Sequence, residues 1–199
     1  MKFDPNGSNV AKAYEIMTYS ITPRPIAWVS TISTDGVKNL APYSYFTPIC
    51  NIPMLVGFSL GRKSKGKKKD TLVNIESTKE FVINMVTESL AEAMNKTATA
   101  YPPHIDEFEK TNLTPIRSEI VSPPMVKESP IRMECRLKQI LEFGENLKYH
   151  NFVIGEVVMV HIKDEFVLDG HVQAGKLNII GRLGSMENLY CRTTDMFKI

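Results

Sequence analysis

One stretch decides the fold class of this chain, residues 22–46, which read TPRPIAWVSTISTDGVKNLAPYSYF. The β-branched and aromatic residues around Trp28 predict a strand over residues 24–33. The Asp35-Gly36 pair that follows is typical of a tight hairpin turn. A second strand is therefore expected to run back over residues 38–46, antiparallel to the first.

Further apolar stretches predict four more strands. Two of them, residues 54–60 and 80–86, are short and lie in the first half of the chain. The other two, residues 131–143 and 147–162, are longer and are separated by a Gly-Glu-Asn turn at residues 144–146. Because hairpins join neighbouring strands in both halves, the sequence favours an antiparallel barrel of about six strands with helical insertions over an alternating parallel sheet.

Two short helices are expected between these strands. The first begins with Asp70 or Thr71 as its capping residue and ends near residues 77–78. The second begins at residues 89–92, which match the capping-box pattern S-x-x-E, and runs through about Ala98, before the Tyr-Pro-Pro sequence at residues 101–103. The chain is therefore mainly β with helical insertions.

The remaining composition sets the limits of the fold. Residues 105–130 are rich in Pro, Ser and Glu, which indicates an excursion over the surface with at most short pieces of secondary structure. The hydrophobic fraction of 43% and the charged fraction of 23% are ordinary for a globular domain and exclude wholesale disorder. No change of composition marks a linker, so residues 1–199 are expected to form a single domain.

Targeting and redox signals are absent from the sequence. No run of about 20 apolar residues predicts a membrane-spanning helix, and the first residues lack the apolar core of a signal peptide. A cytoplasmic location is therefore expected. Cys50, Cys135 and Cys191 are odd in number and far apart, so we expect reduced, structural cysteines and neither a disulfide framework nor a zinc site.

The strongest local charge feature is the basic run at residues 62–69, where six of eight residues are Lys or Arg. Without those six, 18 basic and 22 acidic residues would remain, a net charge of −4. The run leads into the expected helix start at Asp70, and a helix N-terminus attracts anions. Lys69 and Thr71 are therefore candidates to bind a phosphate group. The alternatives are a solvated lysine loop and a nucleic-acid surface, although the latter usually adds aromatic stacking platforms.

The opening hairpin offers a second candidate site. Small residues, hydroxyl groups and one amide cluster at the facing ends of its two strands, where they could line a flat heteroaromatic ligand. The competing interpretation is an ordinary hairpin with Trp28 in the core, and spacing alone favours it.

Other kinds of active site lack support. The chain has no G-x-S-x-G, no dinucleotide-binding glycine motif and no P-loop. Its four histidines do not have the spacing of metal ligands on a helix, so no metal site is expected. His150 is the one histidine retained as a candidate, because it begins a long strand where its ring could face a pocket.

These motifs together resemble the flavin reductase-like family of FMN-binding split barrels, in particular its flavoredoxin-like members. The resemblance covers roughly residues 20–195 and depends on the order and distances of several short segments rather than on any one of them. These are residues 23–31, 39–46, 69–71 with 74–75, 134–135, 154–157, 181–183 and Tyr190.

The resemblance implies a six-stranded antiparallel Greek-key split β-barrel that forms a homodimer, with FMN near the subunit interface. It implies that the phosphate is bound by Lys69 and Thr71, and that Arg182 and Tyr190 close the site. The residues that would line the ring and the ribityl chain are Trp28, Ser30, Thr31, Asn39, Ala41, Pro42, Tyr43 and Ser44. His150 resembles a catalytic histidine that meets flavin or nicotinamide, but Lys148-Tyr149 replaces the usual Gly-Asp before it, which leaves NAD(P)H use open.

Three functions follow for testing. The first is an FMN-binding oxidoreductase that transfers reducing equivalents from NAD(P)H to flavin. The second is a flavoredoxin-like electron carrier that serves a redox partner protein and has no NAD(P)H activity of its own. The third is a non-enzymatic barrel that binds nucleic acid through residues 62–69. The lack of an acid–base pair does not oppose the first two, because flavin carries its own redox chemistry.

Overall fold

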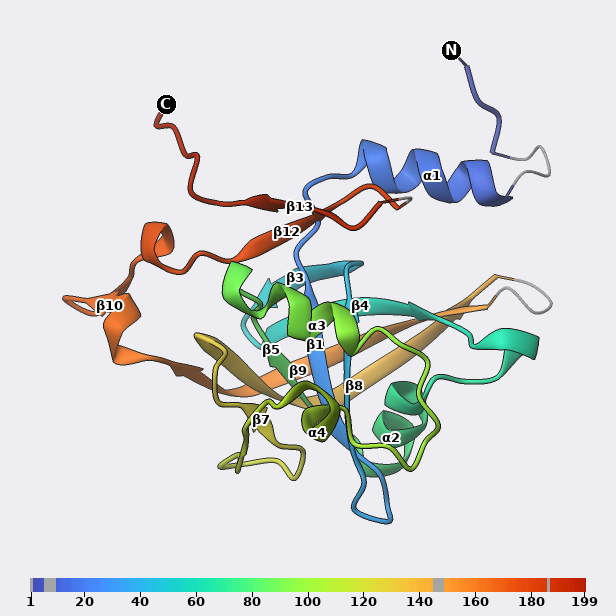
Figure 1. Ribbon diagram of the computed structural model, residues 1–199, viewed down its shortest axis with the longest axis horizontal. Coiled ribbons are helices and arrows are strands. Elements are labelled where there is room, and N and C mark those ends of the chain that lie inside the picture. The colour runs from blue at the N-terminus through green and yellow to red at the C-terminus, as the bar shows by residue number, and fades with distance from the viewer. Residues whose placement is uncertain (1, 6–9, 145–148, 186) are drawn as a thin grey trace.

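The computed structural model describes residues 2–5, 10–144, 149–185 and 187–199. The described residues form one seven-stranded antiparallel sheet and three two-stranded pairs (Figure 1). In the order in which they lie in the large sheet, its strands are β2 (Lys38–Tyr43), β1 (Ala27–Ile32), β5 (Glu80–Asn84), β8 (Ile131–Phe143), β9 (His150–Ile162), β4 (Met54–Gly61) and β3 (Phe46–Asn51).

The large sheet closes into a split barrel. Its two edge strands, β2 and β3, are consecutive in the chain and are joined only by Ser44 and Tyr45. Opposite edges of a flat sheet could not be joined by so short a link, so the sheet must curl. The backbone N–H of Ser59 in β4 donates to the carbonyl of Tyr45 at 2.8 Å, which continues the pairing across the link.

The number of strands differs from the expected six for a local reason. The strand expected over residues 38–46 ends at Tyr43, and the chain resumes as a separate strand at Phe46. The D-G hairpin is as predicted, since Ala27 pairs with Tyr43 and Ile32 with Lys38. The long hairpin of β8 and β9 is also present, but residues 145–146 of its expected turn at 144–146 lie outside the described residues.

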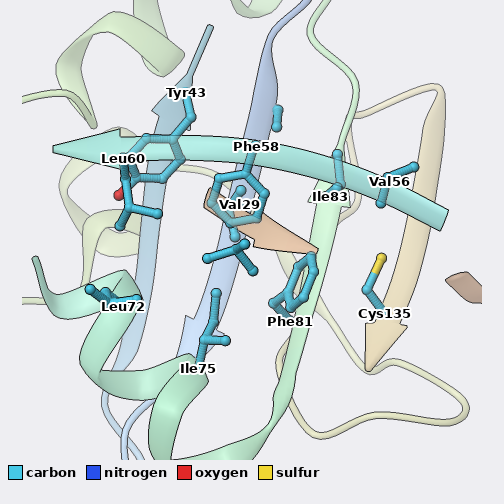
Figure 2. Packing of buried hydrophobic residues seen from close by; sticks show 12 residues of the cluster. Val29, Tyr43, Val56, Phe58, Leu60, Leu72, Ile75, Phe81, Ile83 and Cys135 are labelled. Atoms are coloured by element: carbon cyan, nitrogen blue, oxygen red, sulfur yellow. The ribbon is translucent and has the colours of Figure 1, made fainter. Parts of the chain in front are cut away.

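The barrel interior is apolar and is covered at one end by α2 (Asp70–Thr78). Figure 2 shows Leu72 and Ile75 on the side of this helix that faces Val29 and Phe58, and all four side chains are fully buried. The rings of Phe58 and Phe81 meet edge to face with centroids 5.6 Å apart. This packing fixes the first turn of α2 against the hairpin of β1 and β2.

Two capping predictions are wrong. Lys69, not Asp70 or Thr71, is the N-cap of α2, and no side chain caps this helix start. The carboxylate of Asp70 instead pairs with Lys63, and the hydroxyl of Thr71 is turned into a buried network. The second helix, α3 (Ala91–Lys96), follows a 3-10 turn at Glu88–Leu90, and its N-cap Leu90 has no side-chain oxygen to form a capping box.

Residues 105–130 are more than a surface excursion. They contain α4 (Glu107–Thr111), β6 (Pro115–Ile116) and β7 (Met125–Val126), and their buried side chains include Phe108 and Val126. Phe108 packs in the second apolar cluster, which also contains Trp28. This segment therefore forms one wall over the outer side of the opening hairpin.

Two further pieces, at the chain ends, are not predicted by the sequence patterns. The helix α1 (Val10–Ser20) lies beside the C-terminal pair of β12 (Ile180–Leu183) and β13 (Leu189–Arg192) (Figure 1). Arg24 joins them, because its guanidinium donates to carbonyl oxygens of Thr18 in α1 and of Gly184 after β12. The remaining pair is β10 (Val167–Leu168) and β11 (His171–Val172). No described helix is long and apolar enough to cross a membrane.

Candidate functional site

A pocket lies between the opening hairpin and the start of α2, and we call it the β2–α2 pocket. The strand β2 contributes Asn39, Ala41, Pro42 and Tyr43 to its lining, and α2 with its N-cap contributes residues 69–71. The opposite wall is residues 97–101, and Lys63 and Glu107 complete the lining. The structure thus brings together the two regions that the sequence singled out separately.

A buried polar network fixes Thr71 at the floor of this pocket. Its hydroxyl oxygen accepts hydrogen bonds from Asn39 Nδ2 at 3.0 Å and from the Tyr43 hydroxyl at 2.8 Å. Thr31 holds Asn39 in place by accepting a second hydrogen bond from Nδ2 at 3.2 Å. Because a hydroxyl has two acceptor positions and one hydrogen, only the hydrogen of Thr71 remains for another partner. Thr71 is therefore oriented as a donor.

Lys69 gives the pocket its cation. The ammonium group lies 5.4 Å from the centroid of the Tyr43 ring, a cation–π distance. Partial burial lowers the pKa of Lys69, the nearby charge of Lys63 lowers it further, and Asp70 opposes both. Within the described part of the chain no carboxylate forms a salt bridge with Lys69, whereas Lys63 is paired with Asp70. A half-buried cation beside an uncapped helix start is suited to an anion.

Glu107 is a buried carboxyl on the same lining, and the sequence analysis did not identify it. Only 6% of the residue is exposed, and one carboxyl oxygen accepts a hydrogen bond from the backbone N–H of Leu40 at 3.1 Å. Burial raises the pKa of Glu107 to about 7, and the charges of Asp106 and Asp70 add to this effect. The pocket therefore contains an acid that changes charge near neutral pH.

A second pocket adjoins the first, and we call it the Arg182 pocket. The two share Pro42 and Ala98 as lining residues. The other residues that line the Arg182 pocket are Tyr14, Arg24, Ile26, Ser44, Met94, Asn95, Arg182, Asn188 and Tyr190. The expected site residues Pro42, Ser44, Arg182 and Tyr190 are thus neighbours in space, although up to 148 positions separate them in the chain.

Three of the expected site residues lie behind these linings. Trp28, Ser30 and Thr31 are fully buried and line neither pocket. Trp28 supports the far wall, because its indole Nε1 donates to Thr97 Oγ1 at 2.9 Å. Ser30 donates to the carbonyl of Pro124 in the segment 105–130. Trp28 and Thr31 therefore hold the pocket residues Thr97 and Asn39 in place.

His150 lies away from both pockets. It is exposed at the start of β9 and pairs across the sheet with Gly61. A side chain at Gly61 would meet the imidazole at 3.4 Å, so the ring covers this glycine. The neighbouring Tyr149 lies under the guanidinium of Arg62, 5.7 Å from the ring centroid.

Three of the six basic residues in the run form ion pairs. Arg62 pairs with Glu142, Lys63 with Asp70 and Lys68 with Glu76. Lys69 faces the β2–α2 pocket. These contacts fold the run back onto the protein.

Comparison with known proteins identifies similar chains over most of this length. A sequence model of the flavin reductase like domain matches residues 19–175. The crystal structure of nitrilotriacetate monooxygenase component B from Bacillus cereus is similar, with a TM-score of 0.94 and 37% identity over 100% of this chain and 98% of that one. The crystal structure of the 2-nitrobenzoate 2-nitroreductase of Pseudomonas fluorescens has a TM-score of 0.89 and 31% identity, over 100% of this chain and 95% of that one. The flavoredoxin of Desulfovibrio vulgaris shares the fold. Its TM-score is 0.78 and its identity 20%, over 100% of this chain and 97% of that one.

Proposed function

This chain belongs to the flavin reductase-like family of flavin-binding split barrels, and on that premise we propose that it is an oxidoreductase that binds FMN and transfers reducing equivalents to it from NAD(P)H. One observation carries the proposal. Lys69 and Thr71 of the α2 start line the same pocket as Asn39 and Tyr43 of β2. The proposed phosphate site and the proposed site for a flat ligand are therefore parts of one surface.

The donors present fit the phosphate of FMN. An uncapped helix start, the ammonium of Lys69 and the hydroxyl of Thr71 line this pocket, and within the described residues Lys69 forms no salt bridge. Charge-assisted hydrogen bonds of this kind are stronger than neutral ones. We propose that Lys69 and Thr71 hold the phosphate, and that Asn39 and Tyr43 orient Thr71 for it.

The ring is proposed to lie toward Pro42 and Ala98, where the two pockets meet. When bound, FMN would supply the redox chemistry of the site. The chain's own residues would bind the phosphate, cover one face of the ring and leave the other accessible. Trp28 and Thr97 would keep the wall of residues 97–101 in place through their buried hydrogen bond.

The electron-carrier alternative is favoured by one observation. His150, which the resemblance would place at flavin or nicotinamide, lines neither pocket. A protein that does not bind nicotinamide would not need a histidine beside the flavin. We retain His150 as the proposed catalytic contact for NAD(P)H, and its replacement by Asn tests the assignment.

The deciding experiment is to mix purified protein with NADH or NADPH and excess FMN and to follow nicotinamide absorbance. Oxidation that is dependent on the protein and reduced in His150→Asn supports the reductase. A yellow protein that oxidises neither nucleotide but accepts electrons from a chemical reductant is the carrier, and it would serve a redox partner protein. A colourless protein that fails to bind FMN overturns both functions.

We also propose that the protein is a homodimer. An apolar hollow lies between the end of α1 and β3, lined by residues that include Met17, Ile21 and Phe46. Half or more of the surface of Met17 and Ile21 is exposed, at 50% and 59%. This hollow shares Arg24 and Ser44 with the Arg182 pocket, so a second copy seated there would border the flavin site. Light scattering on wild type and Met17→Glu tests this, with a dimer expected only for the wild type.

The nucleic-acid alternative gains no support from the basic run. Three of its cations are paired with carboxylates of the same chain, and Lys69 faces the β2–α2 pocket. A polynucleotide surface depends on free cations that release counterions on binding. Binding of a random-sequence oligonucleotide that weakens steeply with salt would contradict this reasoning.

A further inference from the structure

The Arg182 pocket contains cationic charge with no acidic group to balance it. Arg24 and Arg182 both line the pocket, and none of its lining residues is Asp or Glu. Within the described residues neither arginine forms a salt bridge. Each arginine adds to the positive potential at the other. Burial is the main cause of the lowered pKa of Arg24, and the charge of Arg182 adds to it. An anion that entered the pocket would relieve this repulsion.

The guanidinium groups of Arg24 and Arg182 differ in how accessible they are to a ligand. Arg24 is 5% exposed, and its two terminal nitrogens donate to backbone carbonyl oxygens, while its buried Nε has no hydrogen-bond partner among the described residues. It therefore serves as a fixed background charge. Arg182 is only half-buried, and its side-chain partners are neutral. It donates to the Tyr190 hydroxyl at 2.6 Å and to Asn188 Oδ1 at 3.3 Å. Arg182 is therefore the group that a ligand could reach.

The Arg182 side chain is held ready in one position. Its guanidinium carbon lies 4.8 Å from the centroid of the Tyr190 ring. The Tyr190 hydroxyl in turn lies 3.5 Å from Asn95 Oδ1, at the edge of hydrogen-bond range. A cation that is already oriented loses little conformational freedom when it binds a ligand.

The rest of the lining indicates the shape of the ligand. Ile26, Met94 and Pro42 offer apolar surface, and Tyr14 and Tyr190 offer aromatic rings. A single accessible guanidinium matches one carboxylate, which it can bind through two parallel hydrogen bonds. A pyrophosphate carries more charge and usually recruits several cations or a helix N-terminus. The lining thus favours a small planar molecule with one carboxylate.

We propose that the Arg182 pocket is a binding site for a small planar carboxylate, the second ligand of the flavin site. This inference rests on the proposed function for its placement, because the pocket shares Pro42 and Ala98 with the pocket assigned to FMN. It reassigns Arg182 and Tyr190 from closing over the flavin to holding the molecule that lies against it. Asn95 and Asn188 would add neutral polar contacts at the rim.

Calorimetric titration of the FMN-loaded protein with benzoate and with benzamide tests the proposal, because the two probes share a ring and differ in charge. Benzoate is expected to bind at least tenfold more tightly than benzamide. Arg182→Gln should bring the two affinities within about twofold, while Arg182→Lys should keep part of the preference. Arg136→Gln, an equal loss of charge on an exposed part of β8, should change neither affinity.

Several outcomes overturn the proposal. Equal affinity of the wild type for benzoate and benzamide overturns the proposal by itself. The test therefore does not depend on whether Arg182→Gln folds. A benzoate preference that survives in Arg182→Gln also overturns the proposal. Tighter binding of inorganic pyrophosphate than of benzoate, lost in Arg182→Gln, would assign the pocket to a dinucleotide instead. If FMN fails to bind at all, the proposed function fails, and the same titrations on the flavin-free protein still test the pocket.

Discussion

Replacement of Glu107 by Gln should change how the stability of the protein depends on pH. The carboxyl is buried on the lining of the β2–α2 pocket, and burial raises its pKa from 4.5 to about 7. The folded protein therefore holds this proton at pH values where the unfolded chain has lost it. Stability from this group is fully present below pH 4.5 and is lost as the pH rises through 7.

The size of the change in stability follows from the raised pKa of Glu107. At 1.36 kcal/mol for each pKa unit, the free energy of unfolding of the wild type should fall by about 2 to 3 kcal/mol between about pH 5 and pH 8. Glu107→Gln carries no charge at either pH, and its amide oxygen can still accept from Leu40 N–H. The variant should lack this loss, so it should become the more stable protein at the alkaline end.

Urea denaturation followed by tryptophan fluorescence measures this directly, because Trp28 is the only tryptophan and is fully buried. The difference between wild type and variant removes the contribution of the other titratable groups. Asp106→Asn is a useful companion, since loss of that neighbouring charge should lower the pKa of Glu107 and move the transition to lower pH. A difference between wild type and Glu107→Gln that stays constant from pH 5 to pH 8 would refute the reasoning.

Three other substitutions test the packing and the buried hydrogen bonds of the fold. Gly155→Ala should cost about 1 to 3 kcal/mol in thermal denaturation, because its Cβ would lie 2.3 Å from the Phe81 ring, and Phe81→Leu in the same chain should recover part of the loss. Trp28→Phe removes the indole N–H that donates to Thr97, and it should lower the free energy of unfolding in urea by about 1 kcal/mol or more. An unchanged free energy of unfolding would show that this hydrogen bond does not contribute to stability. Glu134→Gln should cost about 2 to 3 kcal/mol at neutral pH, because the fully buried carboxylate accepts from three backbone N–H groups, which helps to hold its pKa below the ordinary value. That penalty should shrink as acid protonates the wild-type carboxylate, and a penalty that does not change with pH would count against a charged Glu134.

Local patterns were enough to predict the barrel strands. The D-G turn fixes the first hairpin, and alternating apolar residues fix the long pair of β8 and β9, because both signals depend on neighbours in the chain. The break between β2 and β3 depends instead on barrel closure, which residues 44–45 do not reveal by themselves. The helix α1 was missed because its first turn has no acidic residue and its last turn has no basic one, so the charges typical of helix ends are absent. Five large apolar residues in the region 10–21 also remain exposed.

Some residues of the candidate site could also be predicted from neighbours in the chain, and others could not. Lys69 and Thr71 could be selected because a basic run leads directly into a helix. Glu107 could not, since its burial comes from the contact of α4 with β2 across 67 positions of sequence. The capping interpretation of Thr71 failed for a related reason, because a tertiary network with Asn39 and Tyr43 uses its hydroxyl oxygen.

The affinity of FMN compared with riboflavin tests the central claim, that the α2 start and the β2 edge bind one mononucleotide. The two ligands differ only in the phosphate, and Lys69→Met removes the pocket cation while keeping an apolar stem. The substitution is expected to weaken FMN at least tenfold and riboflavin less than twofold, whereas Lys68→Met, which breaks only the exposed pair with Glu76, changes neither. Equal weakening of both ligands by Lys69→Met, or no weakening of either, would contradict the account.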